Sequence, residues 1–199
     1  MNFISHRRNT IAELQSTPKE YGVEVDIRSD RGRLIIHHDP FSQGEIFEVW
    51  LQHYKHGTLI LNIKEEGIEA HLIELMKQNK ITDYFFLDQS FPFLIKWSKL
   101  GERHCAVRIS EFESIETALT LAGKIDWVWV DCFTRFPLTN SDAKRLKNAG
   151  FKLCIVSPEL HGRPAKTEIP HLASLLRERF INPEAICTKE IEFWKECFL

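Results

Sequence analysis

Short apolar runs alternate with amphipathic segments along the whole chain. We expect the apolar runs to form strands at residues 3–5, 23–27, 34–36, 58–64, 84–87, 105–109, 127–130, 152–156 and 185–188. Apolar residues at helical spacing predict helices at residues 11–20, 46–54, 68–79, 92–99, 115–122, 139–149 and 170–180, with a last helix within 189–199. This alternation predicts an α/β fold, in which a parallel sheet is covered by helices on its faces.

Eight of these strands are each followed by a helix, which fits a compact (β/α)8 TIM barrel formed as a single domain by residues 1–199. The remaining strand, at residues 34–36, follows the turn Asp30-Arg31-Gly32 and predicts an extra β-hairpin after the second strand. The loops must be short, because this fold typically needs about 250 residues. A doubly wound open sheet is the alternative, although no glycine-rich phosphate fingerprint follows the first strand.

The second strand places two acids on one face. Val23, Val25 and Ile27 alternate with Glu24 and Asp26, and successive side chains of a strand point to opposite faces. Two neighbouring carboxylates repel each other unless a cation or a proton lies between them. The strand is therefore either part of a cation site or the solvated acidic face of a surface hairpin.

In a barrel of this kind, the side chains at the C-terminal ends of the strands meet at one mouth, where catalysis takes place. The first three units supply histidines, cations and hard oxygen ligands there: His6, Arg7, Glu24, Asp26, Arg28, His38, Asn62 and Lys64. The later strands are followed by further charged residues: Asp88, Arg108, Glu111, Asp131 and Glu159. The later acids are either site residues or solvated loop residues. Proton-transfer groups, a cation and positive side chains are the parts that phosphate-ester chemistry needs.

Composition narrows the class of protein. The formal net charge of −2 leaves no strongly basic face, so we expect no nucleic-acid partner. No apolar run approaches the ~20 residues of a membrane helix, and the first residues do not form a signal peptide, so we expect no transmembrane segment and a cytoplasmic location. The five cysteines form no Cys-x-x-Cys pair and are expected to be reduced, and mostly buried, rather than zinc ligands or nucleophiles.

Five segments carry a resemblance to a known family: Ser5-His6-Arg7, Asn9-Thr10, Gly22-Val-Glu-Val-Asp-Ile-Arg28, Leu34-Ile-Ile-His-His-Asp-Pro40 and Leu61-Asn-Ile-Lys64. In this order they resemble the glycerophosphodiester phosphodiesterase family, which belongs to the phospholipase-C-like phosphodiesterase superfamily of barrels. The family pattern is His-Arg-Gly, Glu-Asn-Thr, Glu-x-Asp, His-Asp and Glu-Ile-Lys. This chain departs from the pattern in three places: Arg8 stands in place of the glycine, the glutamate before Asn9 is missing, and Asn62 stands in place of the glutamate before Ile-Lys.

The resemblance implies a metal-dependent phosphoric diester hydrolase that acts on a small glycerophosphodiester-like substrate in lipid metabolism. It implies that His6 and His38 are the acid and base pair. His37 should point away from His38 if the segment is extended, so we expect a buried, structural role for it.

The resemblance also implies a divalent cation, Mg²⁺ or Ca²⁺, held by Glu24 and Asp26. Asn62, at the third ligand position of the family, can ligate such a cation through its carbonyl oxygen, but it brings one negative charge less than glutamate. Arg7 and Lys64 would contact the substrate phosphate.

Two alternatives to this function stay open. One is a metal-independent lyase that stops at a cyclic phosphate. The other is a barrel that binds a phosphorylated sugar or lipid headgroup without turnover, which the loss of the third acid at Asn62 motivates.

Overall fold

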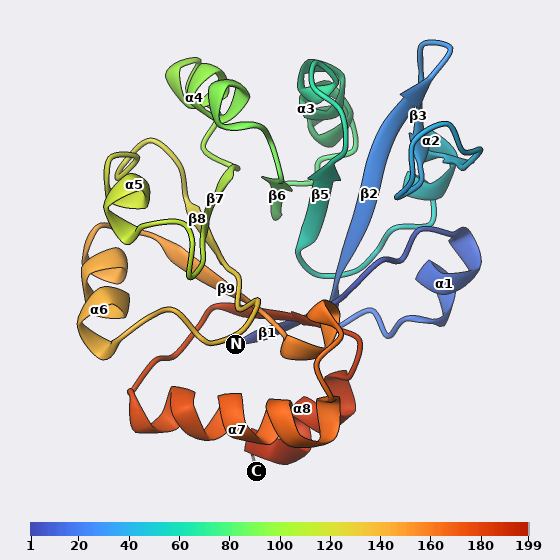
Figure 1. Ribbon diagram of the computed structural model, residues 1–199. Coiled ribbons are helices and arrows are strands. Elements are labelled where there is room, and N and C mark those ends of the chain that lie inside the picture. The colour runs from blue at the N-terminus through green and yellow to red at the C-terminus, as the bar shows by residue number, and fades with distance from the viewer. Residues whose placement is uncertain (199) are drawn as a thin grey trace.

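The computed structural model describes residues 1–198. Parallel strands curl around a common axis, and helices lie outside them (Figure 1). The parallel strands are β1 (Asn2–Ser5), β2 (Gly22–Asp30), β5 (Leu59–Ile63), β6 (Tyr84–Leu87), β7 (Ala106–Ile109), β8 (Trp127–Val130), β9 (Lys152–Val156) and β10 (Ala185–Thr188). The predicted alternation of strands and helices is therefore confirmed along the chain.

The pairing of the strands runs continuously through most of this curled sheet. From β1 it passes through β2 and β5 to β6 on one side, and through β10, β9 and β8 to β7 on the other. Within residues 1–198, the two end strands β6 and β7 meet at a single isolated bridge between Phe86 and Cys105. The sheet thus curls like a barrel, with its weakest seam between β6 and β7.

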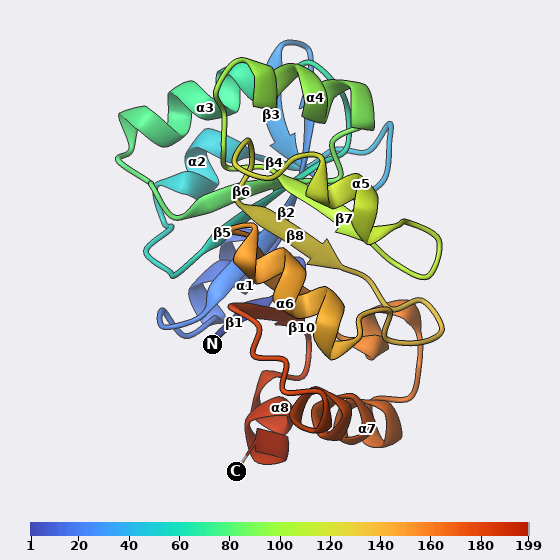
Figure 2. The same ribbon diagram turned by 90° about the vertical axis from the view of Figure 1, so that its left-hand side faces the viewer.

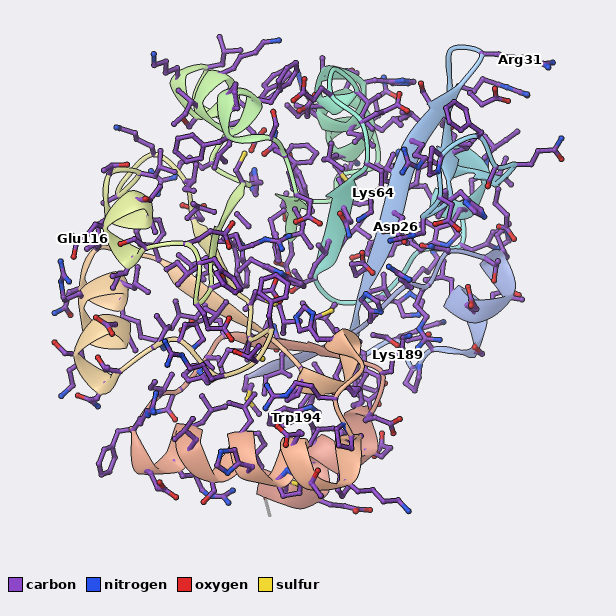
Figure 3. All side chains as sticks on the ribbon, viewed as in Figure 1. Asp26, Arg31, Lys64, Glu116, Lys189 and Trp194 are labelled. Atoms are coloured by element: carbon purple, nitrogen blue, oxygen red, sulfur yellow. The ribbon has the colours of Figure 1, made fainter. Side chains whose placement is uncertain are left out.

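Beyond this sheet, β3 (Arg33–Ile36) pairs with β2 in antiparallel orientation, and β4 (Glu45–Ile46) pairs with β3. The strand β2 extends to Asp30, three residues further than predicted, because its last residues pair with β3. The connecting residues Arg31 and Gly32 both have positive φ, which glycine adopts without steric cost. This tip projects away from the axis of the curled sheet (Figure 3).

The helices are α1 (Ile11–Ser16), α2 (Phe47–Leu51), α3 (Glu69–Gln78), α4 (Phe91–Lys99), α5 (Ile115–Leu119), α6 (Asn140–Asn148), α7 (Ala165–Glu178) and α8 (Ile191–Phe198), with a 3₁₀ turn η1 (Pro158–His161). The views agree that α7 and α8 lie side by side below β1 and β10 (Figures 1 and 2). None of the helices in residues 1–198 combines the length and the apolar composition of a membrane span.

Two helix boundaries were predicted wrongly because of prolines. The helix α1 ends at Ser16 rather than residue 20, since Thr17 precedes Pro18 and adopts an extended conformation. The helix α7 begins at Ala165 rather than Pro170, which lies inside it, although proline favours the first turn of a helix. The prediction for residues 189–199 also includes Leu199, which lies outside the described residues.

The alternation along the strands separates two apolar clusters. An outer cluster lies between the sheet and the helices and includes Val23, Val25 and Ile27. An inner cluster fills the space that the sheet encloses: Ile4, Ile60, Phe85, Leu87, Ala106, Trp127, Trp129, Cys154, Val156, Ala185 and Cys187. Four of the five free cysteines are buried, as predicted, and Cys197 is half-buried. Glu24 and Asp26 alternate with the outer valines, so they point into the enclosed space, as the strand period predicted.

Candidate active site

Glu24 lies at the centre of the candidate site and is fully buried. Its Oε2 accepts the backbone N–H of Arg7 at 2.7 Å, and its Oε1 accepts Nδ2 of Asn62 at 2.8 Å. Arg7 has a φ of 52°, an unusual conformation for a residue other than glycine. His6 Nε2 lies 3.8 Å from Glu24 Oε2. The end of β1 therefore meets β2 and β5 around one carboxylate.

Asp26, which is also fully buried, is surrounded by positive charge. Lys64 Nζ lies 3.3 Å from its Oδ1, and Arg7 Nε lies 3.5 Å from its Oδ2. Figure 3 shows Asp26, on β2, and Lys64, directly after β5, near each other. Asn9 donates from Nδ2 to Asp26 Oδ2 at 2.8 Å and accepts the Asp26 N–H at 3.0 Å. Sequence reasoning did not place Asn9 in the site, although the Asn9-Thr10 motif was a signal for it.

This environment shifts the pKa values of two site residues. Burial, together with the charge of Asp26, raises the pKa of Glu24 to about 7. Burial and the cations Arg7 and Lys189 lower the pKa of His6 to about 3. Burial and the neighbouring Asp26 thus disfavour the charged form of Glu24, and a cation bound beside it would hold it as a carboxylate.

Two oxygen atoms of the cluster lack a hydrogen bond, although one of them, Asp26 Oδ1, already faces the Lys64 ammonium group at 3.3 Å. Oδ1 of Asn62 and Oδ1 of Asp26 are buried and have no hydrogen-bond partner among the described residues. Carboxylate and amide oxygens are the ligands that Mg²⁺ and Ca²⁺ prefer. Within residues 1–198, however, no three His, Cys, Asp or Glu side chains are grouped so that they could hold a metal ion. Glu24 and Asp26 alone therefore do not provide three ligands. They fit a site for Mg²⁺ or Ca²⁺ only if the amide oxygen of Asn62 is the third ligand.

The two adjacent histidines occupy different surroundings. His38 lines the same pocket as His6, and its Nδ1 lies 2.8 Å from Asp39 Oδ1. His37 does not line that pocket; it lies in a neighbouring hollow beside Gln43, which His38 also lines, and its Nδ1 accepts the N–H of Asp39 at 3.0 Å. The prediction that His37 would be buried is wrong, because β3 ends at Ile36 and the chain then bends, which leaves His37 half-exposed.

The pocket at the mouth has a volume of about 290 Å³. Six of the seven predicted site residues line it: His6, Arg7, Glu24, His38, Asn62 and Lys64. Asp26 lies behind them and contacts the pocket through Lys64 and Arg7. The structure thus brings the predicted residues into one place.

The other half of the pocket holds a network of charges that sequence reasoning did not assign. Arg108 forms ion pairs with Asp88 and, at 2.9 Å, with Asp131 Oδ2. His161 contacts Asp131 through Nε2, and Asp88 lies 3.6 Å from Lys64. His161 was missed because it lies in η1, in a segment between residues 156 and 170 for which the sequence predicted neither a helix nor a strand. The sequence placed Asp88, Arg108 and Asp131 at the ends of later strands, but it assigned no role to them.

A loop over this network is held by Glu111. Its carboxylate accepts the backbone N–H groups of Phe133, Thr134 and Arg135 at 3.2, 2.6 and 2.5 Å. Partial burial opposes the charged form, but the N–H groups of Arg135 and Thr134 outweigh it and lower the pKa of Glu111 to about 2. The ring of Phe133 then lies with its centroid 4.6 Å from that of His161, so Glu111 holds a loop that packs against one residue of the pocket lining.

We expect Glu111→Gln to destabilise the protein at neutral pH by about 1–2 kcal/mol, because it removes the charge that these N–H groups bind. The folded pKa lies below the usual value of 4.5, so the contribution is complete above pH 4.5 and is lost as the pH falls toward 2. Thermal unfolding at several pH values should show a lower midpoint, by about 2–8 °C, that converges with wild type in acid. Glu116→Gln, at an exposed ion pair with Arg145, is the control, and an equal effect there would contradict the role of Glu111.

Comparison with known proteins supports the architecture. No family model matches the sequence, and no curated protein is significantly similar to it. A glycerophosphodiester phosphodiesterase from Agrobacterium tumefaciens superposes with a TM-score of 0.66 at 14% identity, covering 99% of this chain and 98% of that one. A glycerophosphoryl diester phosphodiesterase from Parabacteroides distasonis superposes with a TM-score of 0.68 at 10% identity, covering 99% of this chain and 85% of that one. The chain therefore has the fold of glycerophosphodiester phosphodiesterases, the same family that its motifs resemble.

Proposed function

We propose that this protein is a metal-dependent phosphoric diester hydrolase that acts on a glycerophosphodiester-like substrate at the mouth of a (β/α)8 barrel. The observation that carries the proposal is that two imidazoles, His6 and His38, line one pocket together with the buried acid Glu24 and the cation Lys64. The shared fold supports the same activity. A pocket of about 290 Å³ suits a small polar ester rather than a polymer.

Each side chain of the pocket has a separate role in the proposed reaction. Arg7 and Lys64 reach the pocket from the two sides of Asp26, so a phosphate group entering it meets two positive charges. One imidazole takes the proton of the attacking hydroxyl, which belongs either to water or to the substrate. The other imidazole gives a proton to the leaving alkoxide. One ring must start neutral and the other protonated, so activity is expected to be bell-shaped in pH.

Glu24, Asp26 and Asn62 would hold Mg²⁺ or Ca²⁺ in this proposal. The buried Oδ1 atoms of Asp26 and Asn62 support it, since neither has a hydrogen bond among the described residues. Such a cation supplies positive charge that polarises a phosphoryl oxygen. The site carries hard oxygen donors and no thiolate, which favours these ions over zinc.

A metal-independent reaction that ends at a cyclic phosphate is the second candidate. It is favoured by the ion pairs of Asp26 with Lys64 and Arg7, which already neutralise that carboxylate. The Asn62 amide also donates to Glu24 through Nδ2, which stabilises a cluster without a cation.

Treatment with a chelator separates the two candidates. We expect chelation to abolish hydrolysis of glycerophosphocholine or bis(4-nitrophenyl) phosphate, and added Mg²⁺ or Ca²⁺ to restore it. Phosphorus NMR of the glycerophosphocholine reaction should then show the monoester as the product. Full activity after chelation with accumulation of a cyclic phosphate would establish the second candidate instead, and no turnover of any diester with either cation would overturn both.

A further inference from the structure

A groove opens where β6 and β7 separate. The bridge between Phe86 and Cys105 is the pairing that the described residues show between these strands, so Leu87 and Ala106 beyond it are unpaired with each other. A groove of about 640 Å³ lies there, between the two strands and the helices α4 and α5. Its volume is more than twice that of the pocket with the histidines.

The groove crosses the wall of the sheet. Leu87 and Ala106, which line it, belong to the apolar cluster enclosed by the sheet. Leu94 and Val107, which also line it, belong to the outer cluster under the helices. An occupant of the groove would therefore contact both the interior of the barrel and its outer layer.

The groove adjoins the candidate active site. Leu87, Asp88 and Arg108 line both the groove and the pocket that contains His6 and His38. The ion pair between Arg108 and Asp88 joins the ends of β7 and β6 at this junction. A ligand can thus have its polar part in the pocket and an attached part in the groove.

The outer end of the groove exposes aromatic surface. Phe91 at the start of α4 and Phe112 before α5 both line it, with 48% and 80% of their surface exposed. Exposed apolar side chains that gather beside a binding pocket indicate a surface that a ligand covers. A protein partner docking from outside would reach these rings, but Leu87 and Ala106 face the interior, so the deep part of the groove suits a thin chain that enters from the pocket.

We propose that the groove holds the apolar chain of the substrate, and that the natural substrate is a phosphodiester with an alkyl or acyl chain on one of its alcohols. This inference rests on the proposed phosphodiesterase function and narrows its substrate class. The phosphate lies among His6, His38 and Lys64, and the chain runs past the Arg108–Asp88 pair, between β6 and β7, to Phe91 and Phe112.

A series of methyl, butyl and octyl 4-nitrophenyl phosphates tests the proposal. These esters share one chromogenic leaving group and differ only in chain length. We expect kcat/KM to rise by about two- to fourfold for each methylene group that the groove covers. Thr117→Trp, which places a large ring on the exposed groove side of α5, should abolish most of the octyl-to-methyl ratio. Phe112→Ala should lower this ratio, whereas Phe180→Ala, at an equally exposed phenylalanine outside the groove, should leave it unchanged.

The outcomes distinguish the two proposals. Turnover of all three esters with no dependence on chain length would overturn the groove proposal and leave the hydrolase intact. If no ester is hydrolysed, calorimetry with methyl and octyl phosphate, below the concentration at which octyl phosphate forms micelles, decides the question. Tighter binding of octyl phosphate that Thr117→Trp removes would support the chain site without catalysis, and equal binding of the two probes would overturn it.

Discussion

Replacing either His6 or His38 by alanine is expected to lower the turnover of a phosphodiester by about 10²–10⁴-fold, the usual contribution of a general acid or base. Both rings line one pocket, although they come from opposite parts of the site, the end of β1 and the bend after β3. The loss in the double variant should be smaller than the product of the single losses, because in the proposed mechanism both rings serve one proton-transfer reaction. The measurement is kcat/KM for each variant across the pH range in which imidazoles titrate.

His37→Ala is the matched control, since it removes the same ring from the adjacent residue. We expect it to keep most of the activity, because His37, unlike His38, does not line the pocket that contains His6, and it bonds to the backbone of Asp39. Thermal unfolding of the variants checks that each one is folded. An inactive His37→Ala together with an active His38→Ala would mean that the hairpin is shifted by one residue, which would reverse every side chain on it.

The position of the acid pair could be predicted because the period of a strand is local. Val23, Val25 and Ile27 are fully buried in the outer cluster, so Glu24 and Asp26 between them had to face inward. The same reasoning placed Asn62 and Lys64 together on the neighbouring strand. The alternation of apolar and polar residues could not predict that Lys64 and Arg7 neutralise Asp26. These ion pairs depend on distances between segments that lie far apart in the sequence.

The seam in the sheet was beyond prediction for a related reason. The apolar runs at residues 84–87 and 105–109 correctly predicted β6 and β7, apart from one residue at the start of β7. The residues of these two runs do not determine how far β6 and β7 pair with each other, because the extent of pairing depends on the packing of the whole sheet. The groove that follows from this seam, and the exposed side chain of Phe112 beside it, appear only in three dimensions.

His161 illustrates the limit for the site. Its segment contains a proline and a glycine, Pro158 and Gly162, which are typical of loops. The short turn η1 nevertheless directs the imidazole to Asp131, at the end of another strand. The contact between His161 and Asp131 leaves no repeating pattern in the sequence around His161. An analysis of sequence patterns therefore does not identify this histidine.

The second large effect is expected at Asn62, where Asn62→Glu should make the stability of the protein depend on divalent cations. The Asn62 amide now donates to Glu24 Oε1 at 2.8 Å in a buried position. A glutamate there would place a second carboxylate beside Glu24. Without a cation, an uncompensated buried charge of this kind costs about 3–5 kcal/mol. We therefore expect the unfolding midpoint to fall by roughly 10 °C in the presence of a chelator.

Added Mg²⁺ or Ca²⁺ should reverse this loss, because the new carboxylate restores the third acidic ligand and its charge. A cation at a hundred times its dissociation constant stabilises the folded state by about 2.7 kcal/mol, a gain that should be greater for Asn62→Glu than for wild type at equal cation concentration. Asn62→Gln has the length of glutamate without its charge and should show no such gain. If Asn62→Glu is destabilised equally with and without cations, no cation binds beside residue 62. The ion pairs of Asp26 with Lys64 and Arg7 would then suffice to neutralise the acid pair, which would favour the metal-independent reaction.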